Sequence, residues 1–230
     1  MSVKINGIDI SDFGLILLDG YVIGTPEVKS NIIDIPGTST TIDLTESLTG
    51  YIPYNNRMIE MNCVYISDYG TDYHKVQSKV MNFCHGKNVK LIFDNDPTYY
   101  FEGRVNVEST KLRGYQSLRI TADVKPYKYS IYSSAEKWVW DTFNFLTDVA
   151  NQLKELTVVG TLETTVIGSV VPTNPVITSS ATMWVDFEGV RYPVQPGTYT
   201  YYGINLKDDK NILKFTGNGV VTINVRGGSL

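Results

Sequence analysis

The side chains best suited to hold a metal ion are two cysteines and two histidines, Cys63, His74, Cys84 and His85. Zinc sites usually take paired ligands at short spacing, such as CxxC or HxxxH, and none of the four is arranged in that way. The same pattern suits small core residues at Cys63 and Cys84 and a helix end at His85. The sequence therefore predicts no metal site.

Catalytic arrangements are equally hard to build. Asp94-Asn95-Asp96 begins like a calcium loop, but the glycine and the distant bidentate glutamate are missing, and Pro97 suits the turn of a hairpin. With only two histidines, a Ser-His-Asp triad has almost no base to use, and no spacing favours a glycosidase pair of carboxylates. Gly217-Asn218-Gly219 is interpreted as a turn between strands. We predict no catalytic residues, no cofactor and no enzymatic activity.

Aromatic residues gather late in the chain, at Trp184, Tyr192, Tyr199, Tyr201 and Tyr202. They could stack on sugar rings. Alternatively, Trp184 and Tyr192 belong to a core, while the residues from 199 to 202 line a contact with a protein partner, since tyrosine is enriched in such contacts. The residue types favour the second interpretation, and the first stays open.

The composition is that of a folded, mainly β protein. Hydrophobic residues make up 42% and charged residues 19%, with 16 Tyr, 19 Gly and 9 Pro, which excludes a disordered chain. A net charge of −4 without any Lys/Arg run argues against binding of nucleic acid through its phosphates. No apolar stretch approaches the roughly 20 residues needed to span a bilayer. The N-terminus lacks the apolar segment of a signal peptide and cysteines are few, so we expect folding in a reducing cytoplasm.

Residues 1–132 are predicted to form a first domain of strands with one helix. Asn6-Gly7 predicts a tight hairpin, because both positions tolerate positive φ. Asp72 and Gly86 are typical of the two ends of a helix. The further strands are expected in 41–44, 57–66, 89–93, 99–107 and 117–124.

Residues 133–230 are predicted to form a second domain. Residues 130–157 are interpreted as a bridging segment rich in aromatic residues, and from Leu156 onward several short β-patterned runs alternate with Gly, Pro, Asn and Asp. This spacing is typical of a β-sandwich.

Three stretches resemble one known family. Residues 36–63, PGTSTTIDLTESLTGYIPYNNRMIEMNC, contain a Pro-Gly loop, a D-L-T-E-x-L-T-G run and an N-R-x-I strand. INGIDISDFGLIL near the N-terminus and the helix end with its hairpin at 85–105 are also similar to the phage distal tail protein (Dit) family. The resemblance covers most of residues 1–130, whereas the second half is similar to the family's peripheral domain only in its general layout.

The resemblance implies a mainly β fold. The N-terminal domain would be β-sandwich-like, with one packed helix and a long hairpin, and the C-terminal domain a galectin-like β-sandwich. It also implies a structural virion protein, assembled in the bacterial cytoplasm and located at the tail tip. There, a homohexameric ring would link the tail tube protein to the tail-associated hub protein and to receptor-binding proteins, while DNA passes through the lumen without specific binding.

We further hypothesise that the segment 36–59 and the hairpin 94–104 supply much of the ring contact. Arg57 and Arg104 would pair with acidic residues of a neighbouring subunit or bridge groups within one subunit, and both readings stay open. The full set of proposed contact residues is Pro36, Gly37, Asp43, Glu46, Arg57, Asp94, Asp96 and Arg104.

Two other functions remain as alternatives. One is a carbohydrate-binding adhesion module that recognises cell-wall sugars of the host. The other is a tail tube subunit, which would also form rings but stack them into tubes. A wall-degrading hydrolase is the least favoured.

Overall fold

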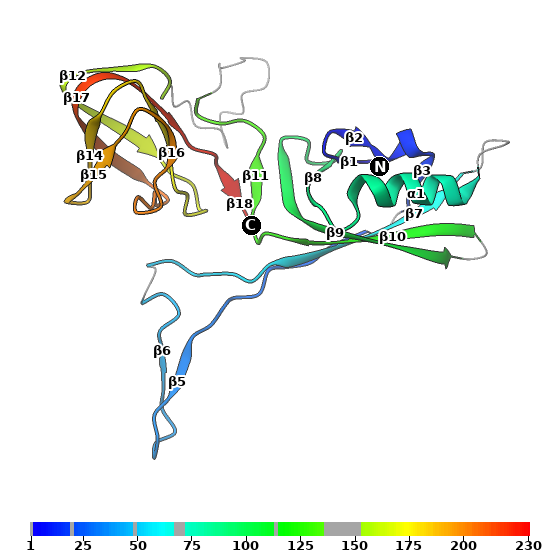
Figure 1. Ribbon diagram of the computed structural model, residues 1–230. Coiled ribbons are helices and arrows are strands. Elements are labelled where there is room, and N and C mark those ends of the chain that lie inside the picture. The colour runs from blue at the N-terminus through cyan, green and yellow to red at the C-terminus, as the bar shows by residue number, and fades with distance from the viewer. Residues whose placement is uncertain (1, 19–20, 48–49, 67–71, 113–114, 136–152) are drawn as a thin grey trace. The chain divides into compact units, whose positions relative to one another are not determined.

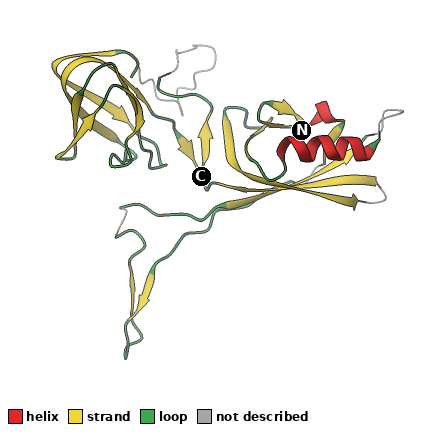
Figure 2. Ribbon diagram, in the orientation of Figure 1, coloured by secondary structure: helices red, strands yellow, loops and turns green. Residues whose placement is uncertain are grey.

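The computed structural model describes the whole chain except residues 1, 19–20, 48–49, 67–71, 113–114 and 136–152. The described residues form two compact units, Met1–Lys128 and Tyr129–Ser229. The mainly β fold is confirmed: strands dominate both units, and α1 is the one α-helix in the described part (Figures 1 and 2). No described helix has the length and apolar character needed to cross a membrane. The segment expected to bridge the domains falls largely on 136–152, outside the described residues.

The first unit is an antiparallel sheet with one helix against it (Figure 2). The strands follow one another across the sheet in the order β2-β1-β8-β9-β10-β7-β3, and β4 also pairs with β7. The bounds are β1 (Val3–Ile5), β2 (Ile8–Asp9), a 3-10 helix η1 (Ile10–Phe13), β3 (Leu15–Leu17), β4 (Val22–Ile23), β7 (Arg57–Tyr65), α1 (Tyr73–Cys84), β8 (Asn88–Phe93), β9 (Tyr99–Leu112) and β10 (Tyr115–Val124).

Strand β7 shows why this sheet has one buried face. Ile59, Met61 and Cys63 alternate along it and are fully buried, as the two-residue repeat predicts. Apolar residues of α1, among them Val80 and Cys84, belong to the same core. The core of the first unit thus lies between the helix and one face of the sheet.

The predicted ends of the helix are confirmed. The Asp72 carboxylate accepts a hydrogen bond from the backbone N–H of His74 at 3.0 Å, which satisfies one of the free donors of the first turn. His85 ends the helix, and Gly86 follows with φ +71°.

Asn6-Gly7 forms the expected turn between β1 and β2, with both φ angles positive.

The second unit is a curled six-stranded sheet around its own core (Figure 1). β17 pairs with β12 along one edge and, along the other, with β14 at residues 214–216 and with β13 at residues 221–224. β15 then pairs with β14, and β16 pairs with β13. The strands are β12 (Leu156–Ile167), β13 (Val176–Ser179), β14 (Met183–Phe187), β15 (Val190–Val194), β16 (Gly197–Thr200) and β17 (Lys210–Asn224). Two short strands outside this sheet, β11 (Lys128–Ser130) and β18 (Gly228–Ser229), pair with each other.

The turn predicted at Gly217-Asn218-Gly219 is wrong, because β17 runs through these residues without a break. The glycines serve a different purpose. A Cβ on Gly217 would lie 2.6 Å from the Cβ of Met183, and both glycines adopt φ near +150°. They let the corner between β13 and β14 approach β17 closely.

A second glycine contact generates a prediction for the first unit. Gly103 of β9 faces Val124 of β10, and a Cβ there would lie 2.1 Å from the carbonyl oxygen of Asp123. Gly103→Ala should therefore lower the free energy of unfolding by about 3 kcal/mol, measured by urea denaturation. Gly227→Ala is the control, since a Cβ at Gly227 meets nothing within 4 Å. Equal stability of the two variants would contradict the close approach of β9 and β10.

Candidate interaction surface

Between β4 and β7 the chain leaves the sheet and forms a long hairpin, called the arm below, which comprises residues 25–47 and 50–56 of the described chain (Figure 1). Its two sides are joined near the base by a bridge between Val28 and Tyr54, and further out by β5 (Ile32–Asp34) and β6 (Thr41–Asp43). β5 and β6 pair with each other in a separate two-stranded sheet. The arm is therefore an extension of the first unit with little apolar support of its own.

The Pro-Gly loop singled out in the sequence forms the tip of the arm. The backbone N–H of Thr38 donates to the carbonyl of Ile35 at 3.3 Å, so Pro36 and Gly37 are the central residues of a β-turn. Gly37 has φ +82°, which a type II turn requires at its third position, and proline suits the second. Pro36 and Gly37 are therefore the residue types that this turn needs to reverse the direction of the chain.

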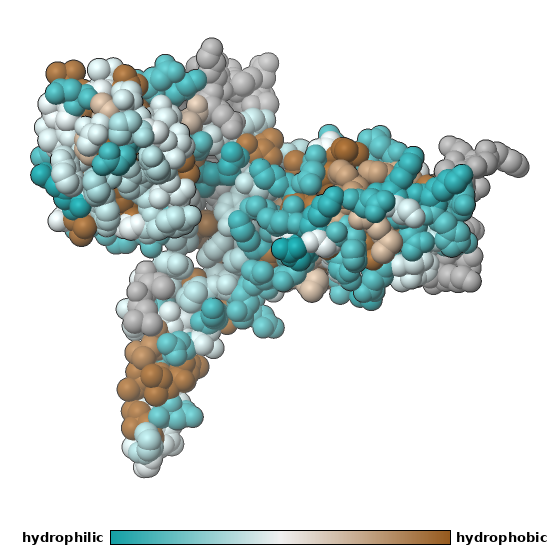
Figure 3. Space-filling view, in the orientation of Figure 1, coloured by the Kyte–Doolittle hydropathy of each residue, from teal (hydrophilic) through white to brown (hydrophobic). Residues whose placement is uncertain are grey.

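Exposed isoleucines distinguish the arm from an ordinary surface loop. Ile33 and Ile42 stand opposite each other on one face, 49% and 46% exposed, and Ile32 is 55% exposed on the other face. Figure 3 shows hydrophobic residues gathered along this hairpin. A two-stranded hairpin is marginally stable in water, and an apolar cluster of this kind typically marks a contact surface.

The base of the arm is held by a buried arginine. Arg57, the first residue of β7, is only 7% exposed and donates from Nη2 to the carbonyl of Pro126. Its guanidinium lies 5.4 Å from the centre of the Phe101 ring, a cation–π contact. Nε has no hydrogen-bond partner within the described chain, and burial lowers the pKa of Arg57. Two possibilities were open for Arg57: contact with a neighbouring subunit, or bridging of groups within one subunit. The contacts with Pro126 and Phe101 are of the second kind.

The other charged residues of the expected ring contact lie in different places. Asp43 and Glu46 belong to the arm, and a hydrogen bond from the Thr45 side chain lowers the pKa of Asp43. Two more lie at or near the turn between β8 and β9: Asp94 accepts from the backbone N–H of Ser2 at 2.7 Å, and Asp96 pairs with Lys128 at 2.6 Å. Arg104, on β9, donates to the carbonyl of Gly86. The structure groups Pro36, Gly37, Asp43 and Glu46 in the arm and the rest on the sheet.

In the second unit, the aromatic residues expected to act together are separated. Trp184 of β14 lies opposite Thr216 on the outer face of the sheet, whereas Tyr199 of β16 lies opposite Ile177, a core residue. Trp184 is 45% exposed, so its predicted place in the core is wrong; its neighbours in register are Pro193 and Thr216, which leave its ring uncovered.

The three remaining tyrosines differ from one another. Tyr192 packs against the core, as expected, and its hydroxyl donates to the carbonyl of Gly203 at 2.8 Å. Tyr201 also packs there, and burial raises its pKa. Tyr202 is 80% exposed.

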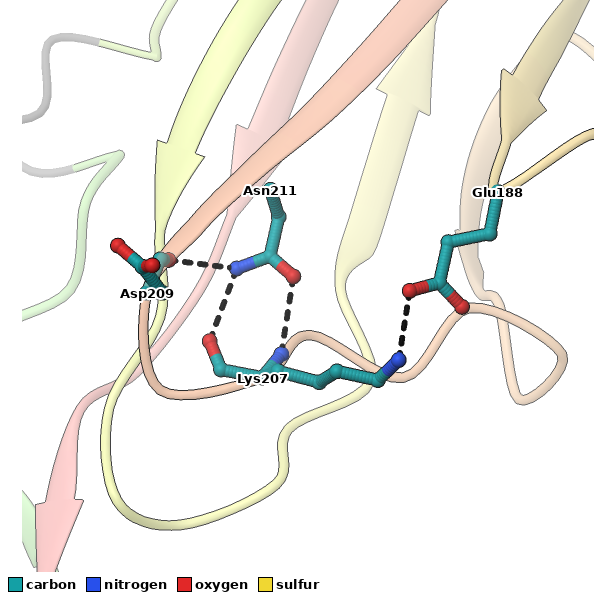
Figure 4. Close-up of polar contacts among 4 residues, drawn as sticks. All are labelled: Glu188, Lys207, Asp209 and Asn211. Atoms are coloured by element: carbon teal, nitrogen blue, oxygen red, sulfur yellow. Dashed lines mark hydrogen bonds and ion pairs between the residues drawn. The ribbon is translucent and has the colours of Figure 1, made fainter. Parts of the chain in front are cut away.

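The side chain of Asn211 is hydrogen-bonded to the backbone of the loop that precedes β17 (Figure 4). Asn211 is 5% exposed; its Nδ2 donates to the carbonyls of Lys207 at 2.9 Å and Asp209 at 2.8 Å, and its Oδ1 accepts from the N–H of Lys207 at 2.9 Å. Lys207 also pairs with Glu188 at 2.6 Å, but both side chains are exposed, and such pairs contribute little. Asn211 therefore fixes the loop, which the sequence did not reveal.

The candidate metal ligands serve the core and the backbone. Cys63 and Cys84 are fully buried, and the backbone N–H of Val107 donates to His85 Nδ1 at 3.0 Å. Among the described residues, no group of three His, Cys, Asp or Glu side chains is placed to hold a metal ion.

Comparison with known proteins gives one informative likeness. No family model and no curated protein matches the chain. Among solved structures, the chain is similar to the crystal structure of the Dit (gp 19.1) protein of phage SPP1, described as a paradigm of the hub adsorption apparatus in phages that infect Gram-positive hosts. The match has a TM-score of 0.60 at 16% identity and covers 100% of this chain and 99% of that chain. The whole chain therefore has the fold of that protein.

Burial of Arg57 yields a prediction about stability. Arg57→Ala removes the packing on Phe101 and leaves a cavity, so the free energy of unfolding should fall by about 2–4 kcal/mol. Arg57→Met keeps most of the volume and removes a poorly compensated buried charge, so its loss should stay below about 2 kcal/mol. Urea denaturation followed by circular dichroism measures both. Equal losses would show that charge and hydrogen bonding matter more than packing.

The buried thiols yield a second prediction. Burial raises the pKa of Cys63 to about 12 and that of Cys84 to about 11, and the thiolate is the reactive form. At pH 8, the folded protein should react with Ellman's reagent far more slowly than the unfolded chain, which should release two equivalents. Rapid reaction of the folded protein would contradict the burial of these residues.

Proposed function

We propose that this chain is a structural protein of a phage tail, of the distal tail protein family, and that it assembles with copies of itself into a ring. The observation that carries the proposal is the arm, an extended hairpin with exposed isoleucines on a fold shared with SPP1 Dit over its full length. The sequence motifs at 36–63 and 85–105 support the same family. The motif at 36–63 spans the distal part of the arm, its return side and most of β7.

Ring closure gives the arm a physical role. A head-to-tail ring needs two different, complementary surfaces on each subunit, and the arm is one of them. Burying its isoleucines against a neighbour would supply the apolar contact that the hairpin lacks alone. Between Glu27 and Ser47 the sequence has four acidic residues and one basic residue. The receiving surface should therefore be apolar with positive charge nearby.

The rest of the assembly follows from the family. The ring, expected to be hexameric, would sit at the tail tip between the tail tube and the hub, with the second unit available to receptor-binding proteins. The protein acts through its interfaces and catalyses no reaction. The net charge of −4 suggests a lumen lined by acidic residues, which would repel the phosphates of DNA and let it slide through. A basic lumen in an assembled ring would contradict this point.

Light scattering coupled to gel filtration, over a range of protein concentrations, tests the proposal. The full chain should shift from monomer towards hexamer as concentration rises. Replacing Ile32, Ile33 and Ile42 together by Ser should raise the concentration needed by at least about a hundredfold, because several kcal/mol of apolar burial are lost. Rings visible by negative-stain electron microscopy should disappear in parallel.

A matched control separates this effect from general loss of apolar surface. Val170, Val190 and Ile212 of the second unit are 60%, 52% and 54% exposed, and their triple replacement by Ser should leave association unchanged. Both triple variants should keep the thermal unfolding of the original chain, since the replaced side chains are exposed. The proposed ring would be overturned if the arm variant associated at the same concentrations as the original chain, or if the original chain stayed a monomer at every concentration. Rings that stack into long tubes would favour a tail tube subunit.

A further inference from the structure

The outer face of the second unit carries a ladder of four charged side chains across four neighbouring strands. Arg191 of β15 lies opposite Asp186 of β14, Asp186 lies opposite Lys214 of β17, and Lys214 lies opposite Glu163 of β12. Directly opposed residues of antiparallel strands point to the same face, so the four form one row. Their signs alternate, and the row as a whole has no net charge.

Part of this row is fixed in place. Arg191 donates to both oxygens of Asp186, from Nε at 2.7 Å and from Nη2 at 2.9 Å. This two-point pairing holds both planar groups in one orientation. A carboxylate has about four acceptor positions and a guanidinium five N–H donors, so both keep capacity for a ligand.

The next row of the same face carries no charged residue and contains Trp184. Trp184 lies opposite Pro193 on one side and Thr216 on the other, and Thr216 lies opposite Thr161. Trp184 precedes Asp186 by two residues on β14, so the indole stands directly beside the charged row. The face therefore combines a ring 45% exposed with a line of alternating donors and acceptors.

We propose that this face binds a neutral oligosaccharide, with one pyranose ring stacked on Trp184. Because the charged row crosses four strands about 4.8 Å apart, hydroxyls of successive sugar units would bond to Arg191, Asp186, Lys214 and Glu163. A pyranose presents C–H groups on its faces and hydroxyls around its rim, which matches an aromatic surface bordered by fixed polar groups. The absence of net charge along the row selects against an ionic ligand. Ile212, two residues before Lys214 on β17 and 54% exposed, lies on the other side of the charged row, so charged groups divide the exposed apolar side chains of this face. A protein interface would need them gathered in one apolar centre.

The site stands apart from the proposed ring function. It lies wholly on the second unit, whereas the arm belongs to the first. Loss of self-association and loss of sugar binding are therefore separate results, obtained from different variants.

Isothermal titration calorimetry of the full chain tests the site. The probes are four neutral oligosaccharides: chitotetraose, cellotetraose, maltotetraose and N-acetyllactosamine. At least one should bind, and Trp184→Ala should weaken that binding at least about tenfold. Trp184→Phe should retain part of it, and Lys214→Ala should weaken it by a smaller factor. Saturation-transfer NMR should place the C–H protons of one ring face against the protein.

Tyr202→Ala is the matched control, because Tyr202 is an aromatic residue of the same unit that is 80% exposed. It should bind as the original chain does, and thermal unfolding should show that all variants are folded. No binding of any of the four probes, binding unaffected by Trp184→Ala, or binding only of an anionic glycan such as heparin would overturn the proposal. Capture of a protein partner that competes at Trp184, without sugar binding, would overturn it as well.

Discussion

The first unit depends on β7, whose buried side chains join the helix, the sheet and the arm. Ile59, Met61 and Cys63 pack inward, while the backbone of β7 pairs with β10 along one edge and with β3 and β4 along the other. Arg57 extends the same buried face to the point where the arm begins. Movement of β7 would therefore disturb the core and the direction of the arm together.

The arm, unlike β7, has no buried core among its described residues to stabilise it. Its strands, β5 and β6, are three residues long and bury none of their side chains, so their own contacts hardly offset the entropy lost on ordering the chain. Local devices limit the number of conformations: the turn at Pro36-Gly37 and the backbone bridge near Tyr54. A hairpin prepared in this way loses less entropy on binding than a disordered loop would. That property suits a contact that must form with each copy of a repeating assembly.

Sequence reasoning predicted the elements whose signals are local. The alternation along Arg57–Ile66, the caps at Asp72 and Gly86, and the Asn6-Gly7 turn each depend on a few adjacent residues, and each was found where expected. Gly217 and Gly219 were misinterpreted because glycine permits both a turn and a close crossing, and the neighbour that decides is Met183, far away in sequence. Arg57 was expected to pair with acidic residues, and its buried contacts were missed for a similar reason: its partners Phe101 and Pro126 come from other strands and loops.

The candidate sites also depend on contacts between residues that are distant in sequence, and these could not be predicted. The motif at 36–63 was visible as a resemblance, but nothing in its residue types shows that about three quarters of it leaves the sheet as an arm. The ladder from Arg191 to Glu163 is invisible in sequence, since its members lie on four strands and only the register aligns them. Trp184 and Tyr199 looked like one cluster because they are close in sequence, yet their strands turn them to different sides of the sheet. Spacing along the chain predicts which elements form, whereas pairing between strands decides which side chains share a surface, and both proposed surfaces of this protein are of that second kind.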